Sequence, residues 1–377
     1  MVYLDNSATT SVSKKAAEKA LYMMTECFGN PSSLHGLGFR AELEIKNARR
    51  IISSALGCRE GELFFTSGGT ESNNTAILGT AIANKRRGNK IVISAFEHSS
   101  VVAAAQYLSQ NGFEAVFVRP DKNGKINPDE IAAAVDDKTV LVSVMLVNNE
   151  IGTVCDVALI AAAARRKNSK IVVHCDAVQA FGKIPVHVGR LGADLLSISA
   201  HKIHGPKGVG ALFVKKGTKI SPMLFGGEQQ NRFRPGTENT ASIAAFGAAA
   251  DEAISTMPQA YAHIKALKQR LVSGLIEIPG VVINSPEDAC PYIVNFSSMS
   301  IKSETMLHFL EQREIYVSGG SACTKGSRSH VLTAMGLSSL AVDTAVRVSF
   351  CSENTESDVD ALLCGVREAL ETLQKIE

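Results

Sequence analysis

Hydrophobic positions in the first two-thirds of the chain fall in short runs separated by longer helical stretches. Residues 139–146 (TVLVSVML) form an almost continuous apolar run, which is typical of a strand buried on both faces. The same patterning predicts strands over 62–67, 90–95, 113–118, 171–175, 194–199 and 209–214, and helices from 71, over 99–110 and over 158–167. This alternation predicts an α/β fold with a mostly parallel, doubly wound sheet. Ligands of such sheets bind beyond the carboxyl ends of the strands.

The pattern changes beyond about residue 240. A helical stretch over 241–276 is followed by short strands at 281–284, 292–297, 315–317 and 345–350, and by helices at 304–312 and from 356. Strands and helices in this looser order predict a smaller α+β domain.

Composition narrows the class of protein. The chain has 377 residues, with 39 basic and 37 acidic side chains, and this balance gives no general reason to bind nucleic acid or anionic lipid. No apolar stretch reaches the roughly 18 residues of a membrane helix. Asp5 and Asn6 lie where a signal peptide needs an apolar core. We therefore expect a cytoplasmic protein, whose eight scattered cysteines are mostly small buried hydrophobic residues.

Polar clusters follow several of the predicted strands. In residues 66–74 (TSGGTESNN), two glycines allow a ligand to approach the backbone, and the helix that Thr70 opens offers N–H groups to a phosphate. The segment is neither a Walker A loop nor GxGxxG, and alone it is equally well explained as a capped turn. Glu97-His98, residues 148–152 (NNEIG) and residues 174–179 (HCDAVQ) also have ordinary explanations as a surface histidine, a turn and an acid with a cationic partner.

Lys202 is the most informative polar residue. It follows the predicted strand 194–199 in a turn rich in glycine and proline, where a lysine is costly unless it is paired or used covalently. A desolvated lysine forms Schiff bases readily. A metal site at His201 and His204 is the rival interpretation, but this spacing lacks matching carboxylates or cysteines, so we predict no metal here.

These clusters together indicate one ligand. Thr70 lies where a phosphate would bind, Asp176 offers a carboxylate to an electron-poor ring nitrogen, and Lys202 offers an amine to an aldehyde. Pyridoxal 5'-phosphate has all three groups, and a Schiff-base lysine with an acidic partner on the pyridine nitrogen is characteristic of its sites.

The ordered set of motifs resembles the NifS/IscS-type cysteine desulfurases, a branch of the class V aminotransferase family with the PLP fold type I. The resemblance covers almost the whole chain. Besides the clusters above, it rests on residues 3–10 (YLDNSATT), 30–35 (NPSSLH), 234–239 (RPGTEN), 318–324 (SGGSACT) and 347–350 (RVSF). It implies a large PLP-binding domain over 12–250 and a small α+β domain over 1–11 and 251–377 that carries the cysteine loop.

The resemblance implies specific roles around the cofactor ring. Lys202 resembles the lysine that holds the cofactor as a Schiff base, and Asp176 the partner of the pyridine nitrogen. Gln179 resembles the amide that bonds the ring hydroxyl. His98 resembles the imidazole stacked on the ring, which also moves protons in catalysis.

Other residues resemble ligands of the phosphate and the substrate. Thr70, Ser199 and His201 resemble phosphate ligands, and Gly69 belongs to the same cofactor-binding segment. Thr237 resembles a phosphate ligand donated by a second subunit, which implies a homodimer. Asn149, also in the cofactor set, and Arg347 resemble the groups that hold the substrate L-cysteine, and a guanidinium suits its carboxylate.

Cys323 is the expected nucleophile. Its Gly, Ser, Ala and Thr neighbours suit an exposed loop, and its thiolate would be the reactive species. In the family this cysteine takes sulfur from L-cysteine, leaving L-alanine and an enzyme persulfide. The enzyme then acts as a sulfurtransferase toward an acceptor such as an iron–sulfur scaffold, a tRNA-thiolation system or nitrogenase assembly. Residues 325–332 (KGSRSHVL) lack the Leu-Glu-Pro that usually follows the cysteine.

Three other functions fit parts of the sequence. A selenocysteine lyase or a general aminotransferase would share the scaffold but would not need Cys323. A nucleotide-binding domain is disfavoured because neither a P-loop nor GxGxxG is present. A non-catalytic interaction protein is disfavoured by the intact set of Lys202, Asp176 and His98.

Overall fold

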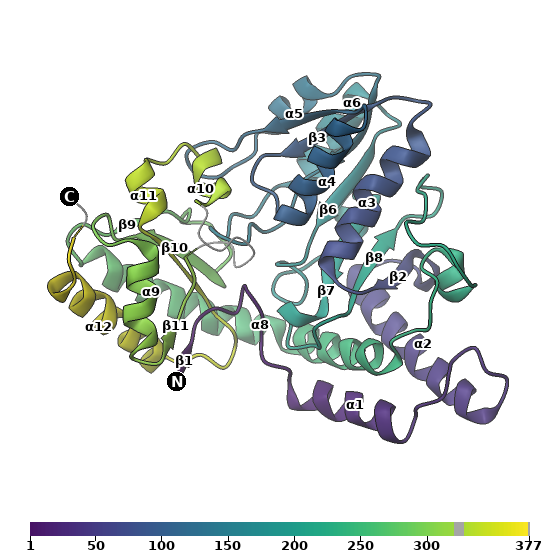
Figure 1. The fold of residues 1–377 in the computed structure, drawn as a ribbon, viewed down its shortest axis with the longest axis horizontal. Coiled ribbons are helices and arrows are strands. Elements are labelled where there is room, and N and C mark those ends of the chain that lie inside the picture. The colour runs from purple at the N-terminus through teal and green to yellow at the C-terminus, as the bar shows by residue number, and fades with distance from the viewer. Residues whose placement is uncertain (320–327, 376–377) are drawn as a thin grey trace.

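The computed structural model describes residues 1–319 and 328–375. Its centre is a seven-stranded sheet in the order β2-β8-β7-β6-β5-β3-β4, in which β8 alone runs antiparallel to its neighbours (Figure 1). The strands are β2 (Leu63–Thr66), β3 (Lys90–Ser94), β4 (Glu114–Val118), β5 (Thr139–Ser143), β6 (Val172–Asp176), β7 (Leu195–Ser199) and β8 (Gly210–Val214). The α/β fold with a mostly parallel sheet, predicted from the sequence, is confirmed.

Alternate residues of these strands face two separate cores. In β3, Ile91 and Ile93 pack with α3 and α4, whereas Val92 belongs to the larger core that includes α2, α6 and α8. Because side chains alternate across a strand, an unbroken apolar strand is needed where helices cover both faces. The helices up to residue 191 are α1 (Lys14–Thr25), α2 (Gly36–Leu56), α3 (Gly69–Asn84), α4 (Ser99–Gln110), α5 (Pro128–Ala134), α6 (Val157–Lys167) and α7 (Val188–Leu191).

A second, smaller group of elements follows α8 (Thr240–Ile276), a single helix of 37 residues that runs along the lower part of the molecule in Figure 1. An antiparallel sheet in the order β12-β10-β9 forms its core, and β1 pairs in parallel with β11. These elements are β1 (Val2–Tyr3), β9 (Val282–Ile283), β10 (Ile293–Ser297), α9 (Ser303–Glu311), β11 (Ile315–Tyr316), α10 (His330–Ala334), α11 (Ser339–Asp343), β12 (Ala345–Ser349) and α12 (Glu356–Thr372).

The N-terminal segment joins the two parts of the molecule. After β1 it follows β12, where the Asn6 amide N–H donates to the Ser349 carbonyl, and then crosses to the turn after β7, where Thr10 bonds His201. The two-domain division stays a proposal; its boundary at residue 250 falls inside α8.

The structure refines two sequence predictions. The strand predicted over 139–146 ends at Ser143, although the N–H groups of Val144 and Leu146 still donate to carbonyls of β6. The helix predicted from residue 71 begins at Gly69. Within the described residues, no helix is long and apolar enough to cross a membrane.

Candidate active site

A cavity of about 260 Å³ lies at the carboxyl ends of β5, β6 and β7. Parallel strands end at one edge of a sheet, so the side chains that follow them converge there. We name this space the strand-end cavity. It is lined by Ser7, Ala8, Gly69, Thr70, Asn73, His98, Met145, Asn149, Asp176, Val178, Gln179, Ser199, His201, Lys202 and Arg347. Every site residue predicted from the sequence is in this set except Thr237 and Cys323.

One end of the cavity is suited to a phosphate. It opens into a hollow where Thr70, Ser199, His201 and Lys207 lie around the start of α3, whose first N–H groups have no partner within the helix. Among the described residues that line this hollow, the one acid is Glu71. Its carboxylate forms an ion pair with the Arg234 guanidinium, with Nε 2.9 Å from Oε1.

The backbone around this hollow requires glycine. Gly68 has a φ of +150°, which side-chain-bearing residues rarely adopt. A Cβ on Gly69 would lie 2.9 Å from Val178 Cγ2. These contacts keep the start of α3 close to the loop after β6.

Asp176 ends β6 and is only 4% exposed. Its carboxylate accepts hydrogen bonds from the Asn73 amide at 2.7 Å and from the Val178 backbone N–H at 2.9 Å. These two donors bond different oxygens of the carboxylate and fix its orientation. Asp176 therefore presents an oriented carboxylate to the cavity.

A chain of hydrogen bonds leads from Asp176 to His98. The Asn73 amide also donates to Ser100 Oγ at 2.9 Å, and Ser100 Oγ lies 2.8 Å from His98 Nδ1. The Ser100 backbone N–H donates to the same Nδ1, because His98 is the N-cap of α4. Since Nδ1 accepts, the neutral imidazole carries its proton on Nε2.

Lys202 lies in the short turn after β7, and its ammonium contacts the N-terminal segment. Nζ donates to the carbonyls of Ser7 at 2.6 Å and Ala8 at 2.7 Å. The Gln179 amide donates to the same Ser7 carbonyl at 2.9 Å. Residues 7 and 8 thus form one wall of the cavity. They are far from Asp176 in the sequence, but they line the same cavity as Asp176 does.

Arg347 approaches the cavity from β12 and is 1% exposed. Its guanidinium pairs with Asp5 at 2.7 Å and donates to the Asn149 carbonyl at 3.0 Å. Asp5 therefore balances the charge that Arg347 carries into the interior.

Burial keeps neighbouring histidines neutral. Burial, reinforced by Lys202 and Lys207, lowers the pKa of His201 to about 3, and burial lowers the pKa of His174 to about 4. His201 can therefore act as a neutral hydrogen-bonding group near Lys202. Burial also raises the pKa of Glu97, which is fully buried, to about 8.

The residues present fit pyridoxal phosphate. Among the described residues, Ser7 Oγ, Asn73 Oδ1, Asn149 Oδ1 and Arg347 Nε are buried without a hydrogen-bond partner, and all four belong to residues that line this cavity. Buried polar atoms are normally paired, so their gathering in one space indicates a polar ligand. The hollow at α3, the Asp176 carboxylate and the Lys202 amine offer partners for a phosphate, a ring nitrogen and an aldehyde.

Two predicted site residues are not in the cavity. Thr237 is exposed and lies beside Gln230, Arg234 and Gly236 in a separate hollow. Cys323 lies outside the described residues.

Sequence reasoning missed the residues that hold the site in place. Asn73 and Ser100 connect Asp176 to His98, and Asp5 and Ser7 bring the N-terminus into the site. Asn73, Asp5 and Ser7 all lie in motifs that the sequence singled out, but nothing in those motifs says which atoms meet.

Comparison with known proteins agrees with this geometry. The model of the family described as aminotransferase class-V matches residues 2–362. A cysteine desulfurase IscS from Methanosarcina thermophila is 42% identical over 378 residues, covering 100% of this chain and 93% of the relative. One from Clostridium botulinum is 42% identical, covering 96% of this chain and 92% of the relative.

Solved structures give the same result. A NifS-like protein superposes with a TM-score of 0.94 at 37% identity, covering 99% of this chain and all of the other. A structure described as SspA in complex with cysteine has a TM-score of 0.83 at 31% identity, covering 94% of this chain and all of the other.

The chain belongs to the class V aminotransferase family. Within that family it belongs to the cysteine desulfurase branch, which confirms the resemblance seen in the sequence. The enzymes of this family depend on pyridoxal phosphate, and so does this one.

Proposed function

We propose that this enzyme converts L-cysteine to L-alanine and transfers the sulfur to Cys323 as a persulfide. The observation that carries the proposal is that Asp176 and Lys202 line one cavity together with the hollow at the start of α3. When bound, pyridoxal phosphate supplies an electron-poor ring that takes up the electrons left at the substrate α carbon.

The residues of the cavity hold the cofactor in this proposal. Lys202 binds it covalently, and Asp176 places its charge at the ring nitrogen. The phosphate lies against Gly69, Thr70, Ser199 and neutral His201. The hollow at the start of α3 and the low pKa of His201 support these phosphate contacts.

Other residues of the cavity bind the substrate and hold a proton for it. Arg347, with Asn149 beside it, binds the carboxylate of L-cysteine, since its Nε is a buried donor that lacks a partner among the described residues. His98, which lines the cavity, would lie against the ring and would hold a proton at Nε2, because the Ser100 N–H donates to Nδ1.

Sulfur transfer needs a thiolate at Cys323. The thiolate attacks the sulfur of the bound substrate, an S–S bond forms, and the C–S bond breaks. Its electron pair stays with carbon, which takes up a proton, so the products are L-alanine and a persulfide. The relative solved with cysteine bound supports this substrate.

The acceptor of the sulfur in this proposal is a protein such as an iron–sulfur scaffold. The IscS-named relatives support this assignment. We place the enzyme in the cytoplasm because the Cys323 thiol must stay reduced to act.

We also propose a homodimer to which Thr237 contributes in trans. α1 and α2, joined by the Lys19–Glu44 ion pair, and the segment between them expose several large apolar side chains, as does the segment before Thr237. These are Leu21, Met24, Phe28, Leu34, Phe39, Leu43, Leu224 and Phe225. A second copy of this chain would cover such a surface.

The activity is tested by incubating the holoenzyme with L-cysteine and measuring alanine together with protein-bound persulfide. We expect both to form in equal amounts before an acceptor or reductant is added. Alanine without any persulfide on Cys323 would instead indicate a lyase.

The dimer is tested by mixing a Lys202→Ala copy with a Thr237→Ala copy. A dimer that shares Thr237 regains one complete site and thus some turnover. Sedimentation as a monomer would contradict the proposal.

A further inference from the structure

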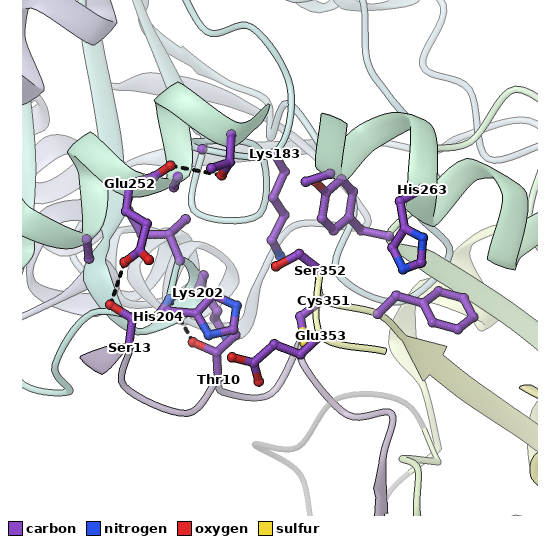
Figure 2. Close-up of a pocket in the computed structure, with 18 of the residues that line it drawn as sticks. Thr10, Ser13, Lys183, Lys202, His204, Glu252, His263, Cys351, Ser352 and Glu353 are labelled. Carbon is purple, nitrogen blue, oxygen red and sulfur yellow. Dashed lines mark hydrogen bonds between the residues drawn. The ribbon is translucent and has the colours of Figure 1, made fainter. Parts of the chain in front are cut away.

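A second cavity of about 380 Å³ lies behind Lys202, between α8 and the residues that follow β12 (Figure 2). We name it the rear cavity. Lys183 reaches into it and is only 5% exposed. Within the described part of the chain, no carboxylate forms an ion pair with Lys183. Burial of an ammonium without a carboxylate partner costs free energy, so the other contacts of Lys183 must account for its place there.

The contacts of Lys183 lead to the strand-end cavity. Nζ donates to Gln179 Oε1 at 3.0 Å and lies 5.7 Å from the centre of the Tyr292 ring, a weak cation–π contact. Gln179 is itself 4% exposed and lines the strand-end cavity. Lys183 therefore lies on the far side of Gln179 from that cavity.

The two neighbours of Gln179 determine which way its amide points. An ammonium has only donors, so it must face the carbonyl oxygen of the amide. The Ser7 carbonyl has only an acceptor, and Gln179 Nε2 donates to it at 2.9 Å. Both contacts require the same orientation of the Gln179 amide. In this orientation the second N–H of Nε2 is the group that can donate to a ligand.

We propose that Lys183 is a positioning residue, which holds Gln179 so that its amide donates an N–H to the oxygen on the cofactor ring. This inference rests on the proposed role of Gln179 beside the cofactor. Without Lys183 the amide could turn and present its carbonyl, which would repel an anionic ring oxygen.

The positive charge of Lys183 reinforces this effect. Burial lowers the pKa of Lys183 to about 8, so the ammonium predominates at pH 7. Its charge polarises the Gln179 amide and makes the Nε2 hydrogens better donors. The titratable groups that face Lys183 or share its cavity are Tyr292, Cys290, Cys351, Arg347, Lys202, His204, His263, Glu252 and Glu353.

The decisive readout is the pH at which the visible absorbance of the bound cofactor changes. A hydrogen-bond donor and a nearby cation stabilise the form of the cofactor that carries more negative charge. They therefore lower the pH midpoint of the absorbance change. Lys183→Met removes the charge and the donor but keeps an unbranched chain. We expect the midpoint to rise by about one pH unit and the affinity for pyridoxal phosphate to fall about tenfold.

Lys268→Met is the matched control. Lys268 is half-buried, whereas Lys183 is buried, but burial lowers its pKa too, and it donates to the backbone carbonyl of Ala289 at 2.8 Å. Its loss should leave the midpoint unchanged. An equal midpoint in Lys183→Met and the wild type would overturn the inference, whereas a wild type that binds no pyridoxal phosphate would overturn the proposed function itself.

A double-mutant cycle separates positioning from packing. If Lys183 acts through Gln179, then Lys183→Met should shift the midpoint much less in a Gln179→Ala background. Additive shifts would contradict a role through Gln179. Should Lys183→Met fail to fold, Lys183→Gln, which keeps an N–H donor without the charge, gives the same cycle and should show about half the shift in the midpoint.

Discussion

The strand-end cavity and the rear cavity meet at Lys202, which lines both, yet their polar groups differ. In the rear cavity Ser13 Oγ donates to Glu252 at 2.7 Å (Figure 2). His263 also has a partner, the Asn354 carbonyl at 2.8 Å. Among the described residues, four of the nine buried side-chain atoms without a hydrogen-bond partner belong to residues of the smaller strand-end cavity, namely Ser7, Asn73, Asn149 and Arg347, and none belongs to a residue of the rear cavity. Unsatisfied polar atoms, rather than volume, therefore indicate where a polar ligand binds.

The largest effect is expected from Lys202→Ala. It removes the amine that we assign to covalent attachment, so nearly all turnover and the visible absorbance should disappear. Lys183→Met, at the other lysine of the rear cavity, should keep the covalent link. Absorbance spectra and alanine formation check both variants, and a Lys202→Ala enzyme that keeps its visible band would give the role to another lysine.

Cys323→Ser should abolish the persulfide while leaving the cofactor in place, because the groups that bind it lie in the strand-end cavity. The measurement is mass spectrometry of the protein after L-cysteine is added, beside a cofactor titration. Cys364→Ser, at an exposed free thiol, is the control. Sulfide and alanine at the wild-type rate from Cys323→Ser would favour a lyase.

Asp176→Asn keeps the shape of the side chain but removes its charge. We expect turnover to fall about 10²–10³-fold, because the charge that develops in the transition state loses a preorganised partner. The affinity for L-cysteine should change less. The measurement is the rate at which the variant, with cofactor bound, forms alanine in a single turnover. A near-normal rate would make Asp176 a structural acid only.

Asn73→Ala should have a smaller effect. It removes the donor that joins Asp176 to Ser100, and a hydrogen bond to a charged group is worth about 1.5–3 kcal/mol, so we expect turnover to fall at least about tenfold. Asn74→Ala is the control, because its amide donates to the backbone carbonyls of Thr70 and Ser100 rather than to the Asp176 carboxylate. Equal losses in the two variants would show that Asn73 only stabilises α3.

The smallest effect on turnover is expected at Glu97, where stability should depend on pH. Its pKa is about 8 in the fold against an ordinary 4.5, so the folded protein binds the extra proton between these values. The resulting stability is full below pH 4.5 and is lost as pH rises toward 8, by up to about 1.4 kcal/mol per pH unit. Urea unfolding at pH 5 and pH 8 should show a smaller loss in Glu97→Gln than in the wild type. The exposed Glu287→Gln should behave as the wild type.

Apart from the run 139–146, which ends as a strand at Ser143, the sequence predicted the strands of the central sheet to within one residue at each end, because most of their residues are buried and apolar. Helix 99–110 was predicted with its observed bounds. Lys202, Asp176 and His98 could be found because each follows a predicted strand. The contacts of Ser7 and Asp5 could not, because they join segments that are distant in sequence, such as Arg347 with Asp5, and periodicity carries no information about such contacts. Lys183 lies only four residues from Gln179, but both residues are in a turn outside any helix or strand, so no periodic pattern predicts that they meet.

The central claim is that Lys202, and not Lys183, binds the cofactor covalently. The direct test is to load the enzyme with pyridoxal phosphate, reduce it with borohydride, digest it and locate the modified lysine by mass spectrometry. We expect the added mass on the peptide that contains Lys202, and an unmodified Lys183. Modification of Lys183, or of no lysine at all, would contradict it.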